Sequence, residues 1–136
     1  MPLLRTYKLF ISHAWDYNED YYRLTNFLDT YSHFRWENLS VPEHDPVHTV
    51  NELEYELRNR MRPAHLFIIL AGMYVPHREW IDFEIHFARR IGRPILGIKP
   101  WGSERIPLAV QNAADEIVNW NSHSIVSAIR NLALPR

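Results

Sequence analysis

Glu84 is the residue most suggestive of chemistry, because it interrupts an apolar helical face. Residues 80–92 form a helical pattern, and at roughly 100° per residue most of its polar side chains gather on one side. The opposite arc is apolar and comprises Trp80, Ile81, Phe83, Ile85, Phe87, Ala88 and Ile91. Glu84 falls within this arc, where an ionised carboxylate is rarely buried without a partner.

Two explanations for this placement stay open. The Glu84 carboxylate can pair with an arginine of the preceding helix, such as Arg58, Arg60 or Arg62. Alternatively, the apolar arc opens onto a cleft that a polar ligand enters, and Glu84 then acts as a working acid. An apolar, partly dry cleft would strengthen the interaction of this charge with the ligand.

The segments around Glu84 predict an α/β fold. Four apolar runs predict buried parallel strands at residues 7–12, 65–71, 94–99 and 116–120, and the alternation at 34–39 predicts an edge strand. A short helix or turn is predicted at 108–114. Three further helices are predicted from apolar stripes, two between strands and one after the last: Tyr21, Leu24, Leu28 and Tyr31; Val50, Leu53, Leu57 and Met61; and Ile125, Ala128, Ile129 and Leu132. This alternation predicts one flavodoxin-like domain over residues 1–136, with a five-stranded parallel sheet of order 2-1-3-4-5 and helices on both faces.

The predicted strand order places Glu84 beside a ligand crevice. In this topology the strand order reverses between the first and third strands, and ligands bind outside the carboxyl ends of the strands at such a point. Ser12 and His13 end the first strand, and Tyr74 follows the third. Phe10, Tyr74 and Trp80 could stack on an aromatic ring of the ligand.

Composition narrows the class of protein. Hydrophobic residues make up 46% and aromatic residues 13%, which argues against disorder. The formal charge of −1, without a Lys/Arg run longer than a pair, disfavours nucleic-acid binding. No apolar run approaches the roughly 20 residues of a membrane span, and the amino terminus lacks a signal-peptide core. These features predict a cytoplasmic protein without membrane contact, and the absence of cysteine excludes thiolate chemistry.

Other constellations of polar residues are weaker candidates than Glu84. His44, Asp45 and His48 could ligate a metal, but Pro46 favours a loop over the helix that would align them. Ser12 and His13 are adjacent, so within a strand they point to opposite faces and cannot act as nucleophile and base. No glycine-rich phosphate loop follows the first strand. We therefore expect neither a metal nor a resident cofactor.

Four segments in this order resemble a compact bacterial TIR-like family that includes the TIR protein of Thoeris antiphage defence. They are residues 10–13, 41–46, 80–84 and 97–102. Each segment alone is unspecific, whereas their order and spacing extend the resemblance over essentially the whole chain. The resemblance implies cleavage of the nicotinamide–ribose bond of NAD⁺, which is then a substrate and not a cofactor. Some members cyclise the ADP-ribose product into a signal for a separate effector.

The resemblance also implies roles for individual residues. Glu84 would be the catalytic glutamate, with Trp80 shaping the same pocket. Phe10, Ser12 and His13 would line the pocket floor. The region from Trp36 to Thr49 would be a mobile loop involved in self-association, so a homo-oligomer is expected, and we count Trp36 and Tyr74 among the substrate-binding residues.

A rival function is a non-enzymatic TIR scaffold that signals by oligomerising. The environment of Glu84 distinguishes the two functions, since an open pocket favours an enzyme and a buried ion pair favours a scaffold. Losing nicotinamide, a cationic leaving group, needs no strong general acid. A carboxylate that faces the developing positive charge on the ribose would instead stabilise the transition state more than the ground state.

Overall fold

The computed structural model describes residues 5–12, 19–40, 50–71, 78–99 and 106–133. Its parallel strands are β1 (Thr6–Ser12), β2 (Arg35–Asn38), β3 (Leu66–Leu70), β4 (Ile95–Ile98) and β5 (Glu116–Val118). They form one five-stranded sheet in the order β2-β1-β3-β4-β5. The flavodoxin-like α/β architecture expected from the sequence is therefore confirmed.

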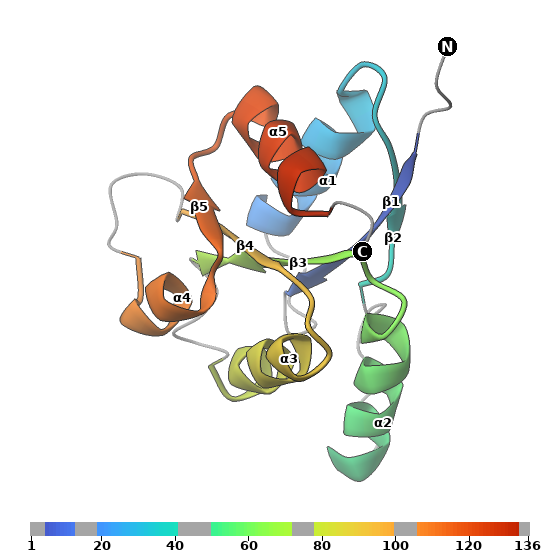
Figure 1. Ribbon diagram of the computed structural model, residues 1–136, viewed down its shortest axis with the longest axis vertical. Helices are drawn as coiled ribbons and strands as arrows, with labels where there is room; N and C mark the ends of the chain where they lie inside the picture. Colours follow the sequence, from blue (N-terminus) through green and yellow to red (C-terminus); the bar gives the residue numbers. More distant parts are fainter. Residues whose placement is uncertain (1–4, 13–18, 41–49, 72–77, 100–105, 134–136) are drawn as a thin grey trace.

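The helices cover both faces of the sheet, as Figure 1 shows. The helices are α1 (Glu19–Thr30), α2 (Val50–Met61), α3 (Arg78–Arg90), α4 (Leu108–Ala113) and α5 (Ser122–Leu132). In this view α1 and α5 lie above the sheet, and α2, α3 and α4 lie below it. Within the described residues, no helix combines the length and apolarity that crossing a membrane would require.

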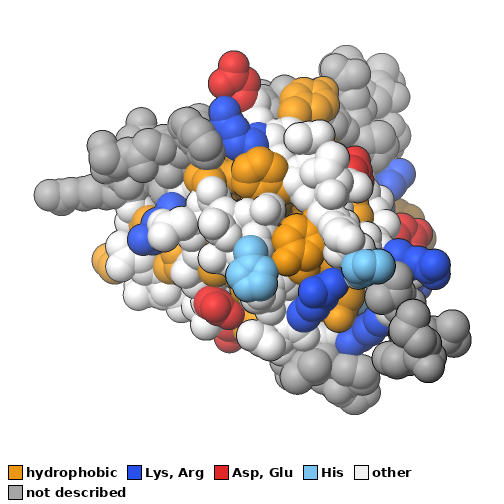
Figure 2. Space-filling model, turned by 90° about the horizontal axis from the view of Figure 1, so that it is seen from above, with side chains coloured by type: hydrophobic (Ala, Val, Ile, Leu, Met, Phe, Trp, Pro, Cys, Tyr) orange, Lys and Arg blue, Asp and Glu red, His pale blue; other side chains and the backbone are white. Residues whose placement is uncertain are grey.

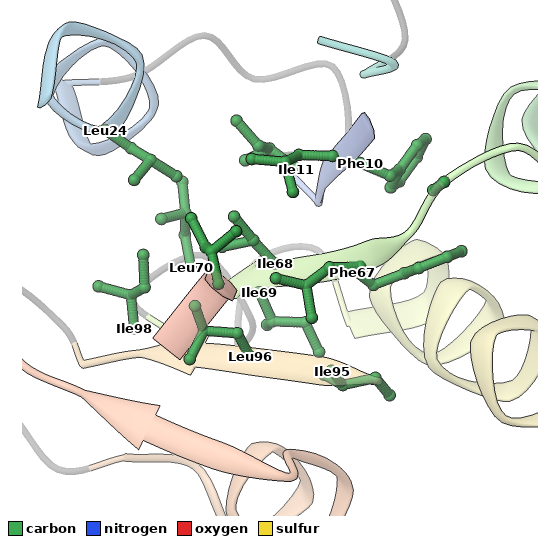
Figure 3. Close-up of a cluster of buried hydrophobic side chains, with 14 of the residues drawn as sticks. Phe10, Ile11, Leu24, Phe67, Ile68, Ile69, Leu70, Ile95, Leu96 and Ile98 are labelled. Atoms are coloured by element: carbon green, nitrogen blue, oxygen red, sulfur yellow. The ribbon is translucent and has the colours of Figure 1, made fainter. Parts of the chain in front are cut away.

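The register of β1 divides the core into two halves. Leu9 and Ile11 pair with Leu66 and Ile68, while the alternate residues Phe10 and Ser12 pair with Phe67 and Ile69. Alternate residues of a strand point to opposite faces. In Figure 3, Leu24 of α1 reaches toward Leu70, whereas Phe10 and Phe67 point to the other side of the sheet. Ser12 therefore faces the layer that contains α3.

The edge strand β2 has the one-sided burial that its alternation predicts. Arg35 and Glu37 are exposed, whereas Phe34 is buried and Trp36 is half-buried. The helical stripes also reach the core, since Leu24, Leu28, Leu57, Met61, Ile125 and Ile129 are all buried. The side chains of Val50 and Leu53 lie outside the described part of the chain.

Side chains replace main-chain acceptors at three strand ends. The amide of Lys8 donates to Nδ1 of His65 at 3.0 Å, the amide of Ile95 donates to Oδ2 of Asp115 at 2.8 Å, and the amide of Ile11 donates to Oγ of Ser40 at 3.0 Å. Burial, followed by the charges of Arg5, Lys8 and Arg93, lowers the pKa of His65, which favours the neutral ring that can accept this bond. Backbone amides that lie beyond the end of the neighbouring strand are therefore still hydrogen-bonded.

Among the described residues on the face formed by α1 and α5, Figure 2 shows hydrophobic side chains interspersed with Lys, Arg, His and other polar groups. Arg130 of α5 explains part of this pattern. Its guanidinium lies 5.9 Å from the ring centroid of Tyr31 and 5.7 Å from that of Phe34. Stacking of this kind covers aromatic rings without removing the charge from water.

Gly97 allows α4 to pack closely against the sheet, and this predicts a stability effect. A Cβ at Gly97 would lie 3.3 Å from side-chain carbons of Val110, Ala114 and Ile117. Gly97→Val should therefore lower the free energy of unfolding by about 1–3 kcal/mol through overpacking. Calorimetry should show a lower Tm than for the control Glu37→Val, which adds the same side chain at an exposed strand position. Equal melting temperatures would contradict close packing at Gly97.

Candidate active site

Glu84 lies in the middle of α3, on the side of the helix that packs on the sheet. Acidic Glu79 in the first turn and basic Arg89 and Arg90 in the last turn complement the helix dipole. Gly92, at a φ of 71°, ends the helix: its amide donates to the carbonyl of Arg89 at 3.2 Å, and the amide of Arg93 donates to that of Ala88 at 2.9 Å. The apolar side chains Ile81, Ile85 and Ala88 are buried on the sheet side of α3, and Glu84, on the same side, is only 4% exposed.

Glu84 and Ser12 form an unusual pair of buried polar groups. Oε2 of Glu84 and Oγ of Ser12 are both buried, and neither has a hydrogen-bond partner among the described residues. Both line a narrow gap whose remaining walls are Phe67, Ile69, Ile85, Ala88 and Ile95. The gap is too tight to hold a water molecule. Buried polar atoms normally find partners, so this pair requires an explanation.

The apolar walls have a large effect on the acid. Burial raises the pKa of Glu84 from 4.5 to about 8, and the nearby Ser12 hydroxyl offsets part of the rise. Ser12 is close enough to favour the charged form, but the two groups do not meet the geometry of a complete hydrogen bond. At neutral pH most Glu84 side chains therefore carry a proton. The upward direction agrees with what partial burial predicts.

The alternative of a buried ion pair is not present within the described residues. Arg58 contacts Oε2 of Glu54 at 3.5 Å and stacks over Phe83, and Arg62 donates to Oδ1 of Asn59 at 2.9 Å. Among the described residues, no cation contributes to the pKa shift of Glu84, whose causes are burial and Ser12. This environment removes the main structural argument for Glu84 as a salt-bridge residue.

The structure brings only some of the predicted site residues together. Ser12 adjoins Glu84, and Phe10 lies on the same sheet face but is buried in the core, 5.5 Å from the Phe67 ring centroid. His13, Tyr74 and the side chain of Trp80 lie outside the described residues. Their predicted contacts with substrate stay predictions.

Trp36 lies on the opposite face of the sheet from Glu84. It pairs with Tyr7 in the β1–β2 register, and its Nε1 donates to Oδ1 of Asp29 in α1 at 2.7 Å. Trp36 was expected to lie with the other pocket residues, but within one chain it does not. Alternate side chains of a strand point to opposite faces, and that of Trp36 points toward α1. The metal candidates His44, Asp45 and His48 lie in a segment that is not described.

A larger hollow lies at the carboxyl end of α3. Glu84 does not line it, and therefore does not face an open cleft of the kind that the sequence suggested. This hollow of about 340 Å³ is lined by Arg89, Gly92, Arg93, Pro94, Ile95, Ala113 and Asp115. Its polar groups have structural roles: Arg93 donates to the carbonyls of Ala64, Ile91 and Arg62, and Asp115 accepts from Ile95. It also lies at the amino end of β4, away from the carboxyl edge where ligands bind in such sheets.

Sequence reasoning did not single out two neighbours of the site, Ser40 and Phe67. Phe67 belongs to an apolar strand, so nothing in the sequence separates it from its core neighbours. Ser40 is buried and accepts the amide of Ile11, one residue before Ser12. A lone serine after a short edge strand carries no local pattern that would reveal this contact.

Comparisons with known proteins identify the family. The protein-family model described as Thoeris protein ThsB, TIR-like domain, matches residues 10–105 of this chain. None of the curated proteins compared with the chain matches it significantly. Among solved structures, the Clostridium botulinum CMP N-glycosidase BcmB has a TM-score of 0.56 at 15% identity, covering 93% of this chain and 99% of that chain. At this identity the likeness shows a shared fold.

The buried acid predicts how stability depends on pH. The folded pKa of Glu84 is about 8 and its ordinary value 4.5, so between these values the unfolded chain releases a proton that the folded protein keeps. The stabilisation that the neutral Glu84 gives the fold is therefore fully present below pH 4.5. As the pH rises from 4.5 to about 8, the free energy of unfolding falls by up to about 1.4 kcal/mol per pH unit. Glu84→Gln cannot ionise and should become more stable relative to wild type across this interval.

Urea unfolding of both proteins across the interval measures the difference and cancels the titration of other groups. Glu79→Gln, an exposed substitution in the same helix, serves as the control and should parallel wild type. A constant difference between Glu84→Gln and wild type would show that Glu84 ionises with an ordinary pKa in the folded protein.

Proposed function

We propose that this chain, which belongs to the Thoeris ThsB TIR-like domain family, is a nucleotide N-glycosidase that cleaves the nicotinamide–ribose bond of NAD⁺. The observation that carries the proposal is that Glu84 and Ser12, two buried polar groups that line the same gap, have no hydrogen-bond partner for Oε2 and Oγ among the described residues. Burying a polar group without a hydrogen bond lowers the stability of the fold, so such groups are expected to serve another purpose. A ligand with hydroxyl groups would supply the missing partners.

The chemistry follows from the charge that develops on the ribose. The bond between C1′ and the ring nitrogen breaks, its electron pair leaves with nicotinamide, and positive charge accumulates on the sugar. The Glu84 carboxylate would face that charge, with Ser12 accepting from or donating to a sugar hydroxyl. Water completes hydrolysis to ADP-ribose, whereas a nucleophile within ADP-ribose closes a cyclic product that could signal to a separate effector.

The proton on Glu84 favours a second candidate substrate. Neutral bases such as cytosine leave as anions unless an acid protonates them, and a buried carboxylic acid with a pKa of about 8 is a competent donor near neutral pH. The fold neighbour BcmB is a CMP N-glycosidase. A nucleoside monophosphate is therefore the second candidate, and it requires the protonated form of Glu84 where NAD⁺ requires the ionised form.

Access to Glu84 is a condition of either reaction. The described walls leave no space for a water molecule, whereas ligand pockets commonly measure about 300–1,000 Å³. A substrate therefore reaches the acid only after the gap between α3 and the sheet widens. Self-association, expected for this family, is our proposed cause of that widening.

The first test identifies the substrate through the pH profile. Purified protein is incubated with NAD⁺ or CMP, and the products are analysed by mass spectrometry. With NAD⁺, kcat/KM should rise with pH and level off above about 8, because the free enzyme must ionise Glu84. With CMP as the substrate, kcat/KM should fall through the same value. Absence of turnover of both substrates at high protein concentration would favour the scaffold function.

The second test removes the charge of Glu84. Glu84→Gln keeps the shape of the side chain, so the domain should fold, while turnover of NAD⁺ should fall by about 10²–10³, mainly in kcat. Glu79→Gln, exposed on the same helix, is the matched control and should retain wild-type turnover. Full activity in Glu84→Gln would remove Glu84 from the catalytic step.

The third test concerns assembly. If self-association opens the gap at Glu84, turnover per molecule should rise with protein concentration, in step with the fraction of oligomer measured by light scattering. Constant specific activity over about a hundredfold dilution, with a monomeric mass throughout, would contradict this part of the proposal.

A further inference from the structure

The carboxyl end of β1 extends past its neighbour β2, which leaves its last backbone groups in need of partners. The register between the two strands ends at Leu9 and Asn38, whereas β1 continues to Ser12. Backbone groups of alternate residues in a parallel strand point to the same neighbour. The groups of Leu9 and Ile11 accordingly face the β2 side, and those of Phe10 and Ser12 face β3.

Ser40 replaces the missing part of β2. The amide of Leu39 still donates to the carbonyl of Leu9 at 2.9 Å, but the next donor, the amide of Ile11, is received by the Ser40 hydroxyl at 3.0 Å. This contact joins residues 29 positions apart, and both are buried. Among the described residues, Ser40 is the last anchor of β1 on this side before Ser12.

A second set of bonds holds Ser40 itself in place. Its amide donates to Oδ1 of Asn38 at 2.9 Å, which closes a turn of the kind that Asn favours. The side-chain Nδ2 of Asn38 in turn donates to the Tyr21 hydroxyl of α1 at 2.8 Å. The chain of contacts therefore runs from α1 through Asn38 and Ser40 to the backbone beside Ser12.

We propose that Ser40, oriented by Asn38, is a positioning residue of the Glu84 site: it fixes the backbone at Ile11 so that the Ser12 hydroxyl stays against the Glu84 carboxyl. The expected effect of Ser40 on turnover rests on the proposed function, whereas its expected effect on the position of Ser12 and on the ionisation of Glu84 does not. A merely structural Ser40 would affect stability alone. A positioning Ser40 affects the ionisation of Glu84 as well.

The sign of that effect follows from the contacts of Glu84. The described side chains that line the gap with Glu84 are Ser12, Phe67, Ile69, Ile85, Ala88 and Ile95, none of which titrates. Among the described residues, Ser12 is the group that lowers the pKa of Glu84, against the larger effect of burial. If Ser12 loses its position, the pKa of Glu84 rises further above its usual value.

The experiment compares Ser40→Ala with Ser40→Thr, which keeps the hydroxyl. The Glu84 carboxyl is titrated by carbon NMR in the folded protein, which requires no turnover. Ser40→Ala should move its midpoint to higher pH, and Ser40→Thr should restore it. In the active enzyme kcat should fall about tenfold or more in Ser40→Ala with little change in KM, because a displaced group affects the transition state most.

His65→Ala is the matched control. It removes a side-chain acceptor from the Lys8 amide at the opposite end of the same strand, so it should cost stability and leave the Glu84 midpoint unchanged. Should Ser40→Ala not fold, Asn38→Ala releases the Ser40 amide at an exposed position and should give a smaller shift in the same direction. An unchanged Glu84 midpoint in the folded Ser40 or Asn38 variant would overturn the proposal. A shifted midpoint without turnover of any nucleotide would support it while contradicting the proposed function.

Discussion

The burial of the Glu84 carboxyl, with no counter-ion among the described residues, is the constraint on which the site depends. An ionised carboxylate in such an apolar gap is expensive, so the resting protein keeps the acid protonated, with a pKa raised to about 8. The rest of the architecture makes this arrangement possible. Apolar side chains of α3 pack on the sheet beside Glu84, and apolar residues of β3 and β4 supply the other walls.

Most of the fold was predictable because its signals are local and repeated. The short, continuous apolar runs of β3 and β4 favour strands covered on both faces, and the alternation at 34–39 predicts an edge. The position of Glu84 was predictable for a similar reason, since helical periodicity alone places it on the buried face of α3. Ser12 followed from the rule that ligands bind at the carboxyl edge, where β1 and β3 meet.

The unpredicted features depend on contacts between distant residues. Trp36 was counted among the substrate-binding residues with the region that the family resemblance assigns to 36–49, but it pairs with Tyr7 and its side chain contacts Asp29 on the other face of the sheet. Ser40 gains its role only because β2 ends before β1 does. The width of the gap also escapes sequence reasoning, since it depends on how closely α3 packs on Phe67, Ile69 and Ile95. Periodicity predicts which side chains face inward but not how much space remains between them.

The closed gap and the proton on Glu84 are two aspects of the same resting state. Excluding water removes the solvation that would stabilise the carboxylate, so the acid stays neutral while the gap stays shut. Admission of a ligand or of water would reverse both conditions together, because hydration, sugar hydroxyls or a cationic ring each favour ionisation. A site of this kind does not need a separate inhibitor to be inactive. Under the proposed reaction, the packing that stabilises α3 on the sheet also holds Glu84 in its protonated form, which would not support the loss of nicotinamide, and an assembly event that loosens that packing would provide both access and charge.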